Sequence, residues 1–156
     1  MSADAFKSEL LWRAYTQYPY FHRGLEIGCG MGERIRVARR RGLSLYGVNP
    51  RDLKGAWGIH GVDVYIKVGE LPNLPFEDEL FDFVTHPYPV MVPDDVYADA
   101  LKDICRVGSR TFYMSLPLDE KKTMEWYVPM ITGAGFKIEV IQKSMGGNLV
   151  MEARKI

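Results

Sequence analysis

Long apolar runs and a surplus of either charge are both missing from this chain of 156 residues. No stretch approaches the roughly 20 consecutive apolar residues that cross a bilayer, so we expect no membrane-embedded segment. Lysine plus arginine and aspartate plus glutamate each number 20, so no net charge attracts nucleic acid to the whole surface. Partners must therefore be inferred from local features of the sequence.

Cysteine is scarce as well. Cys29 and Cys105 lie far apart and fit no metal-binding or redox spacing, and no export signal precedes them. The sequence therefore predicts no metal site and a reducing compartment, which favours a cytoplasmic protein.

The apolar content, 47% of the residues, is enough to bury one core, but 156 residues are too few for two ordinary domains. We expect a single domain over residues 1–156. Apolar residues recur at helical spacing from Phe6 to Tyr18, ahead of Pro19. Residues 1–22 are therefore predicted to form a helix that covers a core over residues 23–156.

Strand and helix patterns alternate along this core. They predict strands over 25–28, 43–48, 62–68, 81–85, 111–116, 137–142 and 149–153. Helices are expected over 33–41, from Pro93 onward, and around 124–131, where Pro129 should kink or split the helix. Strict alternation would place Val62, Val64, Ile66 and Val68 on one face of the third strand.

The order of these elements predicts an α/β fold. We expect a three-layer α/β/α sandwich around a mostly parallel seven-stranded sheet, with one antiparallel strand from a C-terminal hairpin. Ligands of such sheets bind at the carboxyl ends of the strands, near the point where the strand order reverses.

A glycine-rich loop follows the first predicted strand. Glycines occupy the alternate positions 28, 30 and 32, and Glu26 stands two residues before the first. Such a loop turns tightly and lets a ligand approach the backbone. A dinucleotide fingerprint would have its third glycine one position later, which disfavours a nicotinamide-dependent oxidoreductase. Glu26 is instead suited to accept hydrogen bonds from an amino group or hydroxyls.

The segment from Leu25 to Gly32, LEIGCGMG, resembles the first motif of the class I S-adenosylmethionine-dependent methyltransferases. Residues 68–84, VGELPNLPFEDELFDFV, resemble the third-strand and fourth-strand region of this family. Residues 101–107 and the Gly135-Phe136 pair resemble its later elements in the same order. The resemblance implies a Rossmann-like sheet, S-adenosylmethionine as the cofactor and methyl transfer as the activity.

The resemblance also implies a set of cofactor-binding residues. Glu26 and the backbone of Gly28, Cys29 and Gly30 would face the methionine part. Asn49 stands where the family usually has an acid for the ribose hydroxyls, so the sequence departs from the pattern there. The residues implied around adenine are Pro50, Glu70 and Leu71.

His86 lies in the segment Thr85-His86-Pro87-Tyr88-Pro89, where the acceptor or the methionine part should pass. An unperturbed histidine, with a pKa of about 6.5, suits a general base, so His86 is the candidate catalytic residue. A structural histidine fixed between prolines is the equally favoured alternative.

Five arginines at positions 34, 36, 39, 40 and 41 crowd one predicted helix. A solvated helix face is favoured over an RNA-facing patch, because cations suit the carboxyl end of a helix. The acceptor is unspecified, with a small molecule favoured, and the bare fold leaves room for a homo-oligomer or partner subunit. The alternative is a non-catalytic methyltransferase-like protein that binds the cofactor or a partner protein.

Overall fold

The computed structural model describes residues 23–144 and 146–156, and the helix expected over residues 1–22 lies outside them. The strands are β1 Gly24–Ile27, β2 Leu45–Asn49, β3 Ile66–Val68, β4 Phe81–Pro89, β5 Gly108–Pro117, β6 Phe136–Lys143 and β7 Asn148–Lys155. The α-helices are α2 Glu33–Arg40, α3 Lys54–Ile59, α4 Tyr97–Val107 and α5 Met124–Gly133. Two short 3₁₀ helices are η1 Asp63–Tyr65 and η2 Asp94–Val96.

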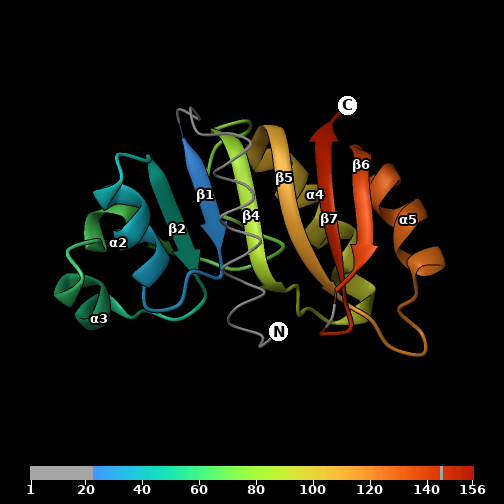
Figure 1. Cartoon of the computed structure of the whole chain (residues 1–156), viewed down its shortest axis with the longest axis horizontal. Helices are drawn as coiled ribbons and strands as arrows, with labels where there is room; N and C mark the ends of the chain where they lie inside the picture. The colour runs from blue at the N-terminus through green and yellow to red at the C-terminus, as the bar shows by residue number, and fades with distance from the viewer. Residues whose placement is uncertain (1–22, 145) are drawn as a thin grey trace.

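One seven-stranded sheet organises the described residues, in the order β3-β2-β1-β4-β5-β7-β6 (Figure 1). The pairs from β3 to β5 are parallel, and β7 runs antiparallel to both β5 and β6. The predicted α/β fold with a single reversed strand is therefore confirmed. Strand order reverses between β1 and β4, which makes the carboxyl ends of these two strands the expected ligand position.

Helices cover both faces of the sheet. On one face α2 and α3 pack on β2 and β3 around a small core that contains Ile35 and Trp57. On the other face α4 and α5 enclose the larger core, which contains Leu101 and Tyr127. Gly47 leaves the space that α2 and the loop before it need beside the sheet, because an added Cβ there would lie 2.4 Å from Ile35 Cδ1 and 2.8 Å from Cys29 Sγ.

The predicted third strand over 62–68 is wrong in its first half. Only Ile66–Val68 pairs with β2, and Asp63–Tyr65 forms η1, in which the Tyr65 amide donates to the Val62 carbonyl at 3.0 Å. The tight turn breaks the alternation, so Val62 is buried while Val64 is 76% exposed.

Three further expectations differ from the structure. Helix α3 over Lys54–Ile59 was not predicted, since its two glycines weaken the helical pattern. Strand β4 extends to Pro89, beyond the predicted end at residue 85. Helix α5 runs through Pro129 without splitting, so only the kink expected there stays a prediction. Within the part of the chain that the structure describes, no helix has the length and hydropathy needed to cross a membrane.

Candidate active site

The loop between β1 and α2 begins the site. Gly28, Gly30 and Gly32 have φ angles of 75°, 55° and 83°, in the left-handed region that favours glycine. The amides of Gly28 and Cys29 both donate to the Val48 carbonyl, at 2.8 and 3.2 Å, which holds the loop against the end of β2. Apart from Gly30 and its two chain neighbours, no described heavy atom lies within 4 Å of a Cβ added at Gly30. The loop therefore leaves open space beside its backbone.

Glu26 lies at the end of β1 with its side chain fully buried. Its Oε1 is 3.4 Å from Arg34 Nη1, and its Oε2 is buried without a hydrogen-bond partner. Burial raises the pKa of Glu26 to about 7, against the opposing effect of the Arg34 charge and hydrogen bond. A buried acceptor without a donor is costly, so Glu26 is ready to receive a cationic or hydroxyl donor.

Arg34 also connects α2 to β4. Its Nη1 donates to the Tyr88 hydroxyl at 3.2 Å, and its guanidinium carbon lies 5.1 Å from the centre of the Tyr88 ring. The sequence analysis grouped Arg34 with a solvated arginine face and missed this role. One signal was available, because a cation in the first turn of a helix opposes the helix dipole and so indicates a nearby anion.

Asn49, buried at the end of β2, joins two loops. Its Oδ1 accepts from the Gly30 amide at 3.1 Å, and its Nδ2 donates to the Arg51 carbonyl at 2.9 Å. One side chain therefore connects the glycine loop to the loop after β2, and its amide suits this pair because it offers an acceptor and a donor together.

The residues implied around adenine come from the loops after β2 and β3. Pro50 is exposed directly after Asn49, and Glu70 and Leu71 follow β3. The Gly69 amide donates to the Asn49 carbonyl at 2.9 Å, which holds the start of the second loop beside the end of β2. Sheet pairing thus brings these loops to one edge, although within the described residues no side-chain hydrogen bond joins Glu70 or Leu71 to the glycine loop.

His86 lies in β4, opposite Met114 of β5, and is 7% exposed. Its Cε1 would be 3.7 Å from a Cβ at Gly28, and its Nδ1 is buried without a hydrogen-bond partner. Burial lowers the pKa of His86 to about 4, well below the value expected from the sequence. The imidazole is therefore neutral at physiological pH and can accept a proton or a hydrogen bond.

Cys29 lies in the glycine loop, and its pKa is shifted upward, whereas that of His86 is shifted downward. Burial and the nearby Glu26 charge raise the pKa of Cys29 to about 12. The sulfur therefore stays protonated at physiological pH and is a poor nucleophile.

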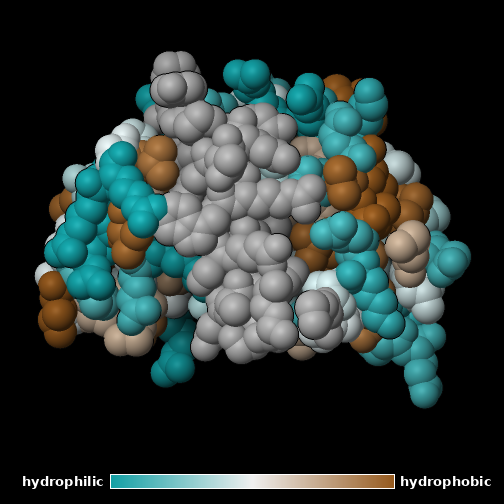
Figure 2. All heavy atoms as spheres, viewed as in Figure 1, coloured by the Kyte–Doolittle hydropathy of each residue, from teal (hydrophilic) through white to brown (hydrophobic). Residues whose placement is uncertain are grey.

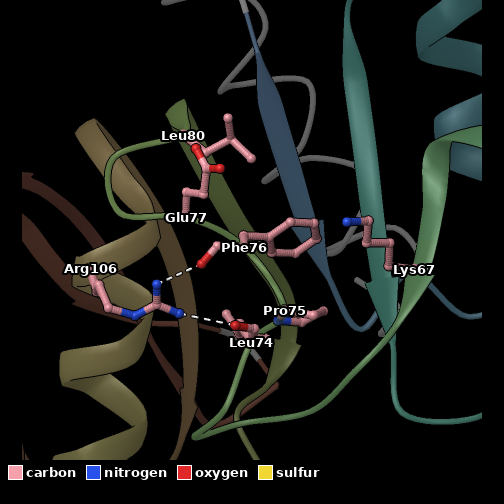
Figure 3. Close-up of a pocket in the computed structure, with 7 residues that line it drawn as sticks. All are labelled: Lys67, Leu74, Pro75, Phe76, Glu77, Leu80 and Arg106. Atoms are coloured by element: carbon pink, nitrogen blue, oxygen red, sulfur yellow. Dashed lines mark hydrogen bonds between the residues drawn. The ribbon is translucent and has the colours of Figure 1, made fainter.

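An open cavity of about 620 Å³ is formed by residues of β3, the loop that precedes β4, and Arg106 of α4 (Figure 3). Arg106 of α4 holds this loop by donating to the carbonyls of Phe76 and Leu74, at 2.6 and 3.0 Å. Its Nε donates to Asp103 at 2.8 Å, and Asp103 in turn accepts from the Leu74 amide at 2.7 Å. Because its donors are used in this way, the Arg106 guanidinium has a structural role.

The glycine loop and the strands around it lie within a segment that matches a known protein family. Residues 25–110 match the model of the methyltransferase domain family. The chain belongs to this family. It is a methyltransferase that uses S-adenosylmethionine, and the non-catalytic alternative is not supported. Among curated proteins, none matches the sequence significantly.

Solved structures of methyltransferases share the fold at low identity. A 1,6-didemethyltoxoflavin N1-methyltransferase of Burkholderia thailandensis is 17% identical, with a TM-score of 0.75 over 97% of this chain and 78% of that one. A TehB-like methyltransferase of Corynebacterium glutamicum is 18% identical, with a TM-score of 0.74 over 96% and 87%. A possible histamine N-methyltransferase of Thermotoga maritima is 21% identical, with a TM-score of 0.68 over 99% and 91%.

The residues around the glycine loop are chemically suited to S-adenosylmethionine. The methionine part of S-adenosylmethionine carries an ammonium group and a carboxylate. Glu26 Oε2 is buried and has no hydrogen-bond partner, so it can accept from the ammonium group. Arg34 places a cation beside it for the carboxylate of the cofactor. The open space at Gly30 admits a ligand against the loop backbone.

Proposed function

We propose that this methyltransferase transfers the methyl group of S-adenosylmethionine to a small-molecule acceptor at the carboxyl ends of β1 and β4. The observation that carries the proposal is the Glu26 carboxylate, fully buried at the switch point of the sheet with one oxygen lacking a donor. Nothing in a purely structural strand-to-helix turn requires a buried charge of this kind.

The methionine part would be held by Glu26 and Arg34 together. Glu26 Oε2 would accept from the ammonium group of the cofactor. The Arg34 guanidinium, whose Nη1 is 3.4 Å from Glu26 Oε1, would pair with the carboxylate of the cofactor. A guanidinium matches a carboxylate with two parallel hydrogen bonds. The backbone of Gly28, Cys29 and Gly30 would line the space between them.

The nucleoside part would lie over the ends of β2 and β3. Asn49 Oδ1 accepts from the Gly30 amide with one lone pair. Its second lone pair would accept from a ribose hydroxyl. Pro50 and Leu71 would cover the adenine ring, and Glu70 would accept from its amino group. The hydrogen bond between Gly69 and Asn49 supports this arrangement, because it fixes the two loops relative to each other.

The acceptor would lie beside β4, where His86 and Tyr88 belong to one strand. S-adenosylmethionine supplies a methyl group bound to a sulfonium sulfur, which leaves readily as a neutral thioether. The protein's main contribution is therefore to position the acceptor. We assign His86 to the acceptor side as a neutral base or hydrogen-bond acceptor. Its unpartnered Nδ1 supports this role, whereas its low pKa makes it a weaker base than an exposed histidine.

A small acceptor is favoured by the similar solved structures. Those from Burkholderia thailandensis and Thermotoga maritima are named for small nitrogen compounds. A cytoplasmic location fits the two free, buried cysteines.

The experiment has two parts. Thermal unfolding should show that S-adenosylmethionine and S-adenosylhomocysteine raise the melting temperature while NADH does not, because only a ligand of the folded state stabilises it. The protein is then incubated with methyl-labelled cofactor and separate small-molecule, protein and RNA fractions of a cell extract. Label in the small-molecule fraction alone supports the proposal. Label confined to protein or RNA, or in no fraction, contradicts the proposed acceptor.

A further inference from the structure

A second cavity, of about 360 Å³, lies away from the proposed cofactor residues, between α2, the end of α3 and η1. Figure 2 shows hydrophilic side chains gathered over the side of the molecule where α2 and α3 lie. The lining consists of Arg36, Arg39, Arg40, His60, Gly61, Val62 and Tyr65. Three of these seven residues are arginines and none is acidic, so the cavity is strongly cationic in a chain of zero net charge.

Arg39 is held rigidly in this cavity. Its Nε donates to the Leu45 carbonyl at 2.9 Å, and its guanidinium carbon lies 3.2 Å from the centre of the Tyr65 ring and 4.7 Å from that of Tyr46. These contacts fix the orientation of the guanidinium before any ligand binds. They leave Nη2 buried without a hydrogen-bond partner.

Arg36 has a similar unsatisfied donor, because its Nε is also buried without a partner. The acidic residues nearest in sequence to the two lining segments are Glu33, one turn before Arg36 on α2, and Asp63 on η1. Neither forms an ion pair with Arg36, Arg39 or Arg40 within residues 23–144. Buried donors of charged groups are costly when unpaired, and both donors belong to residues that line this cavity, so an acceptor bound there is what would satisfy them.

We propose that this cavity binds a phosphate group. Two guanidinium donors and a neighbouring third arginine match the several acceptor oxygens of a phosphate better than the two of a carboxylate. The volume exceeds that of one phosphate, so the ligand would carry more than the phosphate group. Phosphate on a small molecule and phosphate in an RNA backbone share this chemistry. None of the lining residues belongs to the proposed cofactor site, so the inference goes beyond the proposed function.

The test is titration of the protein with inorganic phosphate by calorimetry, against chloride at matched ionic strength. Saturable binding is expected. Arg36→Gln and Arg40→Gln should each weaken it about tenfold, since each removes a charge-assisted hydrogen bond. Arg110→Gln, which removes an exposed arginine of β5, is the matched control and should leave binding unchanged. Absence of saturable binding, or equal weakening by the control, would overturn the proposal.

Two further measurements keep the result interpretable. Melting temperatures without phosphate identify a variant that is merely misfolded, and Arg36→Lys then tests the site by keeping the charge while removing Nε. S-adenosylmethionine affinity should be the same in all four variants, which separates this site from the cofactor site. Competition by 5′-AMP and by oligouridylate distinguishes a small phosphorylated ligand from an RNA backbone. Failure of both to compete with bound phosphate would contradict a phosphate site with room for a larger ligand.

Discussion

Asn49 Oδ1 accepts a hydrogen bond from the Gly30 amide at 3.1 Å, across the space between the ends of β2 and β1. The Asn49 Nδ2 simultaneously donates to the Arg51 carbonyl at 2.9 Å. An acid at this position could keep the first bond but not the second. Asn49 therefore provides a structural link between two loops, and a carboxylate at this position would break its bond to Arg51.

Asn49→Asp should accordingly destabilise the protein without ligand. The substitution places a carboxylate oxygen against the Arg51 carbonyl, and the lost donor is worth about 1–2 kcal/mol of unfolding free energy. Urea denaturation of the two proteins at pH 8 measures the difference. Asn49→Ala, which loses both bonds, should be destabilised further. Equal stability of all three proteins would show that the link contributes nothing in solution.

The same Asn49→Asp variant should bind S-adenosylmethionine more tightly. An oxygen freed from Arg51 can accept a ribose hydroxyl, and charge-assisted hydrogen bonds contribute about 1.5–3 kcal/mol against roughly 1 for neutral ones. A several-fold decrease in Kd by calorimetry is expected. An unchanged or higher Kd would show that the ribose hydroxyls do not lie at residue 49.

Glu26 should make stability depend on pH. Its pKa is 4.5 in the unfolded reference and about 7 in the folded chain, chiefly because of burial. The folded state thus holds the proton more tightly, and stability is lost as pH rises from about 4.5 to about 7. The loss is on the order of 3 kcal/mol. Denaturation of the wild type and of Glu26→Gln across this range isolates the effect, because the glutamine variant lacks this titration. Parallel curves would contradict the raised pKa.

Arg34→Gln should move this titration upward. The Arg34 charge and hydrogen bond both lower the pKa of Glu26, so removing them raises it above about 7. Cofactor affinity at pH 7 should fall roughly tenfold or more, because Glu26 is more protonated and the carboxylate partner is lost. Calorimetry between pH 6 and 8, with Arg110→Gln as the charge-matched control, tests both effects. A shift of the Glu26 titration without loss of affinity would remove Arg34 from the cofactor site.

His86→Ala should separate binding from turnover. Cofactor Kd should change little, while kcat should fall by about a hundredfold or more, because a general base typically contributes about 10²–10⁴-fold. Since burial lowers the pKa of His86 to about 4, the wild-type rate should show no titration of this group between pH 6 and 8. A rate limb near pH 6.5 would mean that the acceptor changes the ionisation of His86. Full turnover of the variant would exclude a role in the chemistry.

The fold could be predicted because strand and helix periods alternate clearly along most of the chain. The alternation from Val62 to Val68 was misleading, since a 3₁₀ turn at Asp63–Tyr65 and a strand produce the same short apolar pattern. The end of β4 was missed for a related reason. Pro87 and Pro89 normally end a central strand, but here the register with β5 shifts between His86 and Pro89, and a bulge accommodates them.

The candidate site could be predicted only as a set of loops. Glycine spacing and Glu26 located the first loop, and strand order explains why the ends of β1, β2 and β4 meet. Burial could not be predicted, and it determines the pKa of both Glu26 and His86. The contact of Arg34 with Glu26 spans eight residues, and no periodic pattern predicts which way a helical arginine folds back.

Gly47 is not itself proposed to hold the ligand, yet it pairs with Glu26 across the sheet and sets the height of α2 above the sheet through the space taken by Ile35 and Cys29. Even a methyl group there would lift the helix, and with it the loop that precedes Arg34. Such a shift misplaces a catalytic arrangement without altering any residue in it. A random mutagenesis screen for lost methyl transfer should therefore recover substitutions at this buried glycine, among proteins that still fold and still carry every residue of the site.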